Sequence, residues 1–176
     1  MTCIVGMIDE KNDKIIMASD SCSINDNNQI GYLKGSKIIQ KNNTLIGVAG
    51  SPIGLQIIKR INEERFKLPI DDIPYLLMEE FKKYNALIHD EGSDLSPCYF
   101  LVARKNNIYE IDSEFCLHEF DTKYHAIGSG EKYALGYLTC ITTFPTIEKS
   151  LAIRLSIECA SRYCPDVGGN TNVLEI

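Results

Sequence analysis

The stretch TCIVGMIDEKNDKIIMAS, residues 2–19, sets the fold class that we expect for this chain of 176 residues. Residues 2–8 (TCIVGMI) and 14–19 (KIIMAS) are short, mostly apolar runs rich in isoleucine, a pattern typical of buried strands. The polar residues 9–13 (DEKND) between them are typical of a turn. We therefore expect the chain to open with two antiparallel strands joined as a hairpin.

Similar strand patterns recur further along the chain. They cover residues 30–40 (around a Gly-Ser kink), 44–49 (TLIGVA), 99–103 (YFLVA), 107–111 (NIYEI), 116–120, 124–127 and 171–176 (TNVLEI). Polar stretches at residues 23–29 and 91–96 are predicted to be loops.

Four segments have helical rather than strand periodicity. One follows Ser51 and Pro52, and a second starts near Asp71 or Asp72, either of which can cap it. A third includes residues 133–139, and a fourth begins after Pro145. The apolar faces expected for the first, second and fourth helices are Ile53, Ile57, Ile58 and Ile61; Ile73, Leu77, Phe81, Tyr84 and Ile88; and Ile147, Leu151, Leu155 and Cys159.

The order of these elements is strands, two helices, strands, two helices and a final strand. Helices grouped in pairs between antiparallel strands favour an α+β fold. Two antiparallel sheets packed face to face, with a helical layer outside each, would bury every apolar face. We therefore predict a four-layer αββα sandwich that forms a single domain over residues 1–176.

Composition excludes several classes of function. The net charge is −6 and the basic residues are scattered, which argues against a nucleic-acid partner. No apolar run approaches the length of a membrane span, and the N-terminus lacks the pattern of a secretory signal. The seven cysteines have no zinc-site spacing, and no phosphate-loop or HExxH motif occurs. We expect a soluble, cytoplasmic protein that needs no cofactor or metal.

Thr2 is the first residue whose chemistry points to a function. A threonine hydroxyl is a weak nucleophile unless a base lies beside it. Removal of Met1, normal before a residue as small as threonine, would leave Thr2 with a free α-amino group of pKa near roughly 8, able to act as that base. Because many proteins begin with Met-Thr, Thr2 alone does not establish this chemistry.

Further motifs follow Thr2 in a fixed order. They are residues 2–6 (TCIVG), 18–20 (ASD), 37–38 (KI), 47–51 (GVAGS) and 126–136 (AIGSGEKYALG). In this order and spacing the chain resembles, over essentially its whole length, the proteasome β-subunit family of N-terminal nucleophile (Ntn) hydrolases, which includes the bacterial protease HslV. The resemblance implies a threonine-type endopeptidase that cleaves peptide bonds through an acyl-enzyme on Thr2.

The resemblance also implies roles for residues near the nucleophile. Lys37 matches the catalytic lysine of the family, whose ammonium favours the deprotonated hydroxyl and amine. Asp20 matches its acidic partner, which keeps that lysine charged and oriented. Ser129 matches a serine that hydrogen-bonds near the amine, although a serine there could also be only a helix cap.

Two more assignments concern the substrate. Gly50 matches the glycine whose backbone N–H stabilises the developing oxyanion. Val48 matches a residue that lines the pocket for the substrate side chain on the acyl side. The family also implies peptide or unfolded-protein substrates, self-association into rings, and an ATPase partner that feeds in unfolded chains.

The chain departs from the family just before Gly168 and Gly169. Where many members have an Asp and a Ser that support the threonine amine, this sequence has Cys164 and Val167, and Asp166 lies two positions out of register. Two alternatives therefore stay open. The chain could be a catalytically inactive scaffold subunit in a ring, or a thiol such as Cys3 could be the nucleophile.

Overall fold

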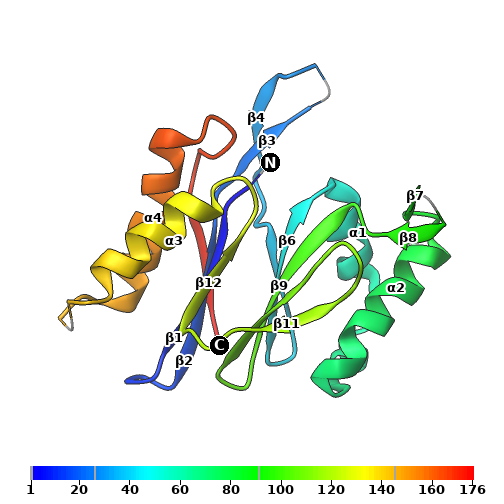
Figure 1. Ribbon diagram of the computed structural model, residues 1–176, viewed down its shortest axis with the longest axis horizontal. Coiled ribbons are helices and arrows are strands. Elements are labelled where there is room, and N and C mark those ends of the chain that lie inside the picture. The colour runs from blue at the N-terminus through cyan, green and yellow to red at the C-terminus, as the bar shows by residue number, and fades with distance from the viewer. Residues whose placement is uncertain (1, 26, 91, 145) are drawn as a thin grey trace.

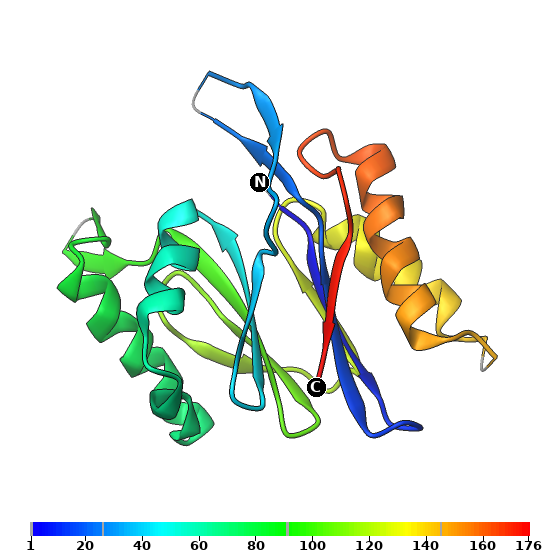
Figure 2. The same ribbon diagram turned by 180° about the vertical axis from the view of Figure 1, so that it is seen from behind.

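A computed structural model describes residues 2–25, 27–90, 92–144 and 146–176. Two antiparallel sheets lie face to face at its centre, and a pair of helices covers the outer side of each (Figures 1 and 2). The predicted four-layer αββα sandwich is therefore confirmed. Met1, on whose removal the proposed nucleophile depends, lies outside the described residues.

The first sheet has the strand order β12-β1-β2-β13. Its strands are β1 (Ile4–Asp9), β2 (Lys14–Ser19), β12 (Tyr124–Ile127) and β13 (Asn172–Glu175). β1 and β2 form the predicted hairpin, with Ile4 opposite Ser19 and Asp9 opposite Lys14. All of β1 is buried, because one face packs on the helices and the other on the second sheet.

The second sheet has the strand order β11-β10-β9-β6-β5. Its strands are β5 (Ile38–Lys41), β6 (Thr44–Gly50), β9 (Cys98–Arg104), β10 (Asn107–Ile111) and β11 (Leu117–Glu119). β6 and β9 run antiparallel, with Leu45 opposite Ala103 and Gly50 opposite Cys98. The strands expected here from the sequence are all present, with ends shifted by one or two residues.

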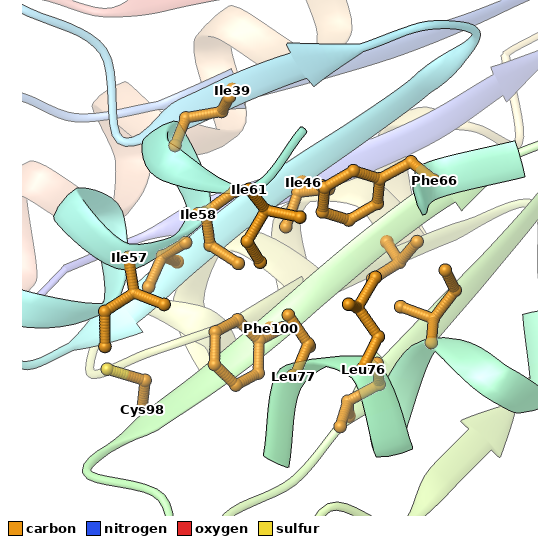
Figure 3. Packing of buried hydrophobic residues seen from close by; sticks show 14 of the residues in the cluster. Ile39, Ile46, Ile57, Ile58, Ile61, Phe66, Leu76, Leu77, Cys98 and Phe100 are labelled. Carbon is orange, nitrogen blue, oxygen red and sulfur yellow. The ribbon is translucent and has the colours of Figure 1, made fainter. Parts of the chain in front are cut away.

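Helices α1 (Pro52–Arg60) and α2 (Ile73–Lys83) cover the second sheet, and the 3₁₀ turns η1 (Glu63–Lys67) and η2 (Ile70–Asp72) connect them. The Ser51 side chain caps α1 by accepting a hydrogen bond from the Ile53 N–H. The apolar faces of both helices pack onto β5, β6 and β9 around Phe81 and Phe100, whose rings meet edge to face (Figure 3).

Two expectations for α2 were wrong. Asp72 occupies its N-cap position, but the side chain makes no capping hydrogen bond. The helix also ends at Lys83, so Ile88 is half-exposed in a strand rather than on the buried helical face. Asn85, just past the helix end, adopts a left-handed backbone conformation, which ends helices.

Helices α3 (Glu131–Ile141) and α4 (Lys149–Tyr163) cover the first sheet. The predicted stripe on α4 was wrong, because Leu151 is exposed. The buried positions are instead Ala152, Ile153, Ser156, Ile157 and Ala160. The small residues in this set let the helix lie close to α3 and to β1 and β2, which longer leucine side chains would prevent. Pro145, before which we placed the start of this helix, lies outside the described residues.

A third apolar cluster fills the space between the sheets. It contains Ile4, Ile8, Met17, Leu45, Leu101 and Ile127, together with their neighbours on the inner faces. Gly47 belongs to this interface, because a Cβ atom there would lie 2.6 Å from the Ile4 side chain. The close approach of the two sheets therefore depends on a residue without a side chain at position 47.

Two short hairpins extend from the sandwich. β3 (Cys22–Ile24) pairs with β4 (Ile30–Tyr32), and β7 (Ile88–Asp90) pairs with β8 (Ser93–Leu95). The first projects beyond the sheets (Figure 1). Both lie partly in the predicted loops at residues 23–29 and 91–96, of which Asp26 and Glu91 lie outside the described residues. Within the described ranges, no helix has the length and apolar character needed to span a bilayer.

Candidate active site

Thr2 lies immediately before β1, where the chain passes the turn between β12 and α3. The Gly130 N–H donates to the Thr2 carbonyl oxygen at 3.2 Å. Gly128 has a φ of +96°, and a Cβ atom there would overlap that carbonyl. The Ser129 hydroxyl accepts from the Thr2 N–H at 3.2 Å and also lies 3.3 Å from the Thr2 carbonyl oxygen. The Gly-Ser-Gly turn therefore fixes the backbone of Thr2.

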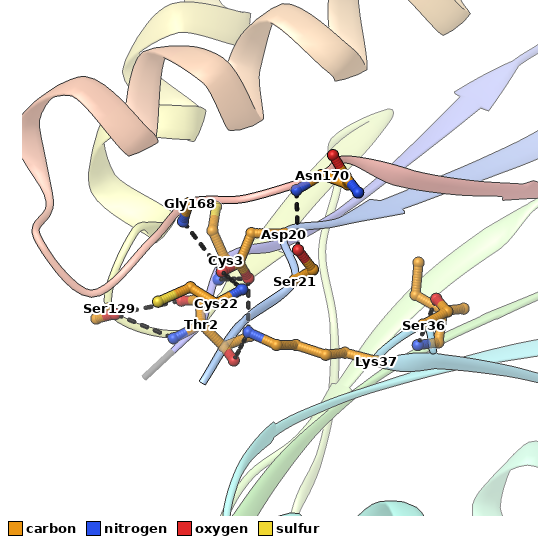
Figure 4. A network of polar contacts seen from close by, with 11 residues as sticks. Thr2, Cys3, Asp20, Ser21, Cys22, Ser36, Lys37, Ser129, Gly168 and Asn170 are labelled. Carbon is orange, nitrogen blue, oxygen red and sulfur yellow. Dashed lines mark hydrogen bonds and ion pairs between the residues drawn. The ribbon is translucent and has the colours of Figure 1, made fainter. Parts of the chain in front are cut away.

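The Thr2 hydroxyl contacts a buried ion pair (Figure 4). Lys37 Nζ lies 2.7 Å from Thr2 Oγ1 and 2.8 Å from Asp20 Oδ1. The side chains of Lys37 and Asp20 are 4% and 0% exposed. Asp20 directly follows β2 and Lys37 directly precedes β5, so the pair connects the two sheets.

Asp20 organises the backbone as well as the lysine. Oδ1 also accepts the Cys3 N–H at 3.0 Å, and Oδ2 accepts the N–H groups of Cys22 at 3.0 Å and Gly168 at 3.3 Å. Three backbone donors and one ammonium therefore compensate the buried carboxylate. Through these bonds a single side chain fixes the N-terminal segment, the start of β3 and the turn before β13 relative to one another.

The site opens onto a cavity of about 490 Å³. Its lining residues are Thr2, Ala49, Gly50, Tyr99, Glu110, Ile127, Gly128, Ser129 and Glu131. Gly50 has a φ of +109°, and a Cβ atom there would overlap the Pro97 carbonyl oxygen. The backbone at the end of β6 is thus open to whatever molecule enters the cavity beside Thr2.

Val48 lies on the other face of β6. Strand alternation points Ala49 into the space between the sheets and Val48 towards α1, where it packs next to Gly54. Ala49, not Val48, is therefore the β6 side chain in the lining of the cavity at Thr2. The role of Val48 in substrate binding stays a prediction.

The positions that depart from the family pattern are apolar in space as well as in sequence. Cys164 and Val167 are buried in the cluster between the first sheet and its helices. Asp166 is half-buried, and among the described residues it makes no hydrogen bond to Thr2. The Thr2 nitrogen is held by Ser129.

The geometry also bears on the alternative thiol nucleophile. Cys3 is fully buried, and burial together with the nearby Asp20 carboxylate raises the pKa of its thiol. A thiol attacks as the thiolate, which this environment disfavours. Cys3 therefore lacks the properties of a reactive cysteine.

Sequence reasoning missed three residues of the cavity wall, Tyr99, Glu110 and Glu131. Tyr99 and Glu110 sit at inward positions of strands whose other inward residues, such as Leu101 and Ile108, form the core between the sheets. A glutamate in phase with buried isoleucine was therefore the available signal. Glu131 directly follows the Gly-Ser-Gly turn.

The fold and this buried threonine–lysine–aspartate arrangement define the class of architecture. It is the sandwich of HslV and proteasome-like Ntn hydrolases. No family model and no curated protein matches the sequence. Solved structures do match the fold.

Three structures illustrate the match. BPH from Thiobacillus denitrificans has a TM-score of 0.81 at 20% identity, covering 100% of this chain and 97% of that one, and it is also known in complex with Epoxomicin. Eukaryotic HslV from Trypanosoma brucei has a TM-score of 0.72 at 16% identity, covering 99% and 98%. Anbu (ancestral beta-subunit) from Yersinia bercovieri has a TM-score of 0.70 at 18% identity, covering 99% and 81%.

Proposed function

We propose that this chain is a threonine-type endopeptidase subunit with Thr2 as its N-terminal nucleophile. The observation that carries the proposal is the contact of 2.7 Å between Lys37 Nζ and Thr2 Oγ1, with Lys37 in turn paired to a fully buried Asp20. A purely structural subunit has no need for a buried ammonium directed at a hydroxyl beside an open cavity. The shared fold with HslV supports the same conclusion.

The reaction begins once Met1 has been removed. The free α-amino group of Thr2 accepts the proton of its own hydroxyl, and Oγ1 attacks the carbonyl carbon of the scissile peptide. The Lys37 ammonium opposes protonation of the amine beforehand and favours the alkoxide, because a neighbouring positive charge disfavours a further one. Asp20 keeps the ammonium in place through their ion pair.

The later steps use the remaining residues. The Gly50 N–H donates to the oxyanion of the tetrahedral intermediate, and one such donor is typically worth about 3–4 kcal/mol of barrier. The amine returns its proton to the leaving nitrogen, which leaves an ester on Thr2. Water, deprotonated by the same amine, hydrolyses this ester. Ser129 orients the amine through the contact of 3.2 Å to the Thr2 nitrogen.

The decisive test is a set of threonine variants assayed on an unfolded protein substrate. Thr2→Ala removes the hydroxyl and is expected to abolish cleavage, whereas Thr2→Ser keeps both hydroxyl and amine and is expected to retain part of it. Thr143→Ala is the matched control, because Thr143 is exposed and its hydroxyl only donates to the nearby Cys140 carbonyl. Cleavage by the Thr2→Ala protein at the rate of the wild type would exclude Thr2 as nucleophile.

Epoxomicin, found in complex with BPH, offers a second test. We expect it to add its mass to the peptide that contains residue 2 in the wild-type protein, and to leave the Thr2→Ala protein unmodified. Addition at any other residue would contradict the assignment.

One observation favours a catalytically inactive scaffold subunit as the second candidate. The apolar Cys164 and Val167 leave the Thr2 nitrogen without the additional polar support known in the family. Intact mass separates the candidates, since the enzyme must lose Met1 and the scaffold need not. Native mass spectrometry tests the proposed ring assembly, and co-purification tests an ATPase partner.

A further inference from the structure

The cavity beside Thr2 is the open end of the space between the two sheets. Strand alternation directs Tyr99, Glu110 and Ile127 inward, in phase with the core residues Leu101 and Ile108. Deeper in the sandwich these inward positions are apolar and filled. At the open end they include a carboxylate, so the wall of the cavity combines apolar surface with negative charge.

Glu110 is held in place by the opposite sheet. Its Oε2 lies 2.7 Å from His125 Nε2, across from β10 to β12. The ring of His125 is stacked on Phe120, with 3.8 Å between the ring centroids. Glu110 therefore has a histidine on one side and the cavity on the other, and its position is fixed independently of any ligand.

Glu131 is the second carboxylate of this wall. It is half-buried at the first position of α3, and among the described residues its side chain makes no hydrogen bond or ion pair. Burial raises the pKa of Glu131, and the neighbouring Glu110 raises it further. A carboxylate that loses water without gaining a cation is an electrostatic deficit, which a positively charged ligand would offset.

We propose that this cavity selects a lysine or arginine side chain of the substrate peptide, with Glu131 and Glu110 as the specificity-determining residues. The inference deepens the proposed function and rests on it. The long aliphatic stem of such a side chain matches the apolar surface of Ala49, Tyr99 and Ile127, while its charged end reaches the two carboxylates. A glutamate in the substrate would meet two like charges and be rejected.

The test measures binding, so that it does not depend on turnover. Fluorescence anisotropy is recorded with the Thr2→Ala protein and three labelled eight-residue peptides that differ only at one central residue, which is lysine, norleucine or glutamate. We expect the lysine peptide to bind about fivefold more tightly than its norleucine isostere, the scale of a partly buried charge pair. Because norleucine has the same stem, this ratio isolates the charge.

Variants then identify the carboxylate. In the Thr2→Ala background, Glu131→Gln is expected to reduce the lysine-to-norleucine ratio to about twofold or less, and Glu131→Lys to favour the glutamate peptide instead. Glu114→Gln is the matched control, since Glu114 is exposed and is not among the cavity residues. A ratio near one in the parent protein, or one that stays the same in all Glu131 variants, would overturn the inference.

Cleavage-site mapping separates this inference from the proposed function. The chain with Thr2 intact digests an unfolded protein, and the products are sequenced by mass spectrometry. Cleavage that shows no enrichment of lysine or arginine near the cut bond contradicts the cavity inference and leaves the peptidase assignment in place. The absence of any cleavage, together with the expected binding ratios, contradicts the peptidase assignment and leaves the cavity inference in place.

Discussion

The buried pair of Lys37 and Asp20 allows a prediction that needs no assay of activity. At 2.8 Å, with both side chains almost fully enclosed, the two charges attract by about 6 kcal/mol at an effective dielectric constant of about 20, and the cost of removing them from water offsets much of this. Breaking such a pair from one side is the costly event, because the remaining charge stays buried.

Lys37→Met removes the ammonium and keeps the volume of the chain. Loss of one partner of a buried pair costs about 3–5 kcal/mol. Asp20 would retain its three backbone N–H donors, so we expect the lower end, about 3 kcal/mol. In a chain of 176 residues this corresponds to a fall in Tm of about 6–12 °C.

A double-mutant cycle tests the reasoning more sharply than either variant. Asp20→Asn leaves Lys37 without its counter-charge and is expected to cost a similar amount as Lys37→Met. The double variant contains neither buried charge, so its cost should fall short of the sum by about 2 kcal/mol. Unfolding in urea at one fixed protein concentration measures all four proteins, since self-association would otherwise change the apparent stability. Single effects that add to within about 0.5 kcal/mol would refute a direct pair.

Two further predictions concern backbone strain and thiol reactivity. Gly50→Ala places a Cβ atom against the Pro97 carbonyl oxygen at a φ of +109°, so we expect thermal unfolding to show a loss of about 1–3 kcal/mol or more; an unchanged Tm would contradict the close approach. Alkylation of the native protein at pH 8 is expected to modify the exposed Cys116, and faster at higher pH because Asp112 raises the pKa of this thiol. Cys3 and Cys98 should stay unmodified, since both are buried and burial raises the pKa of Cys98 to about 11; their modification before unfolding would contradict this.

Much of the fold could be predicted from the sequence because its strands are strongly patterned. The strands at residues 14–19, 107–111 and 124–127 match the expected bounds, since each is an apolar run between polar turns. The pairing of helices between the meanders was then enough to indicate four layers. The candidate site residues, by contrast, come from five separate segments, and only the resemblance to a known family linked them before the structure was available.

The errors have a common physical origin. α4 has two stripes that could face the core, and the periodicity favoured the one with the larger side chains. The selection was made by the neighbouring layers, which come close enough to accept Ala152 and Ala160 but not Leu151. Glu110 was missed for a related reason. Alternation shows that it shares a face with Ile108, but not that this face opens into a cavity at that height.

The position of Asp20 explains why the site can combine such distant parts of the chain. Strand β2 is central in its sheet, between β1 and β13, so a residue at its end lies next to the segments that flank both neighbours. Its carboxylate bonds the Cys3 N–H before β1 and the Gly168 N–H before β13, and it also holds Lys37 from the other sheet. Disturbing any of these connections should move the Thr2 hydroxyl relative to the ammonium. The same bonds that stabilise the sandwich at this edge therefore also set the distance on which the proposed chemistry depends.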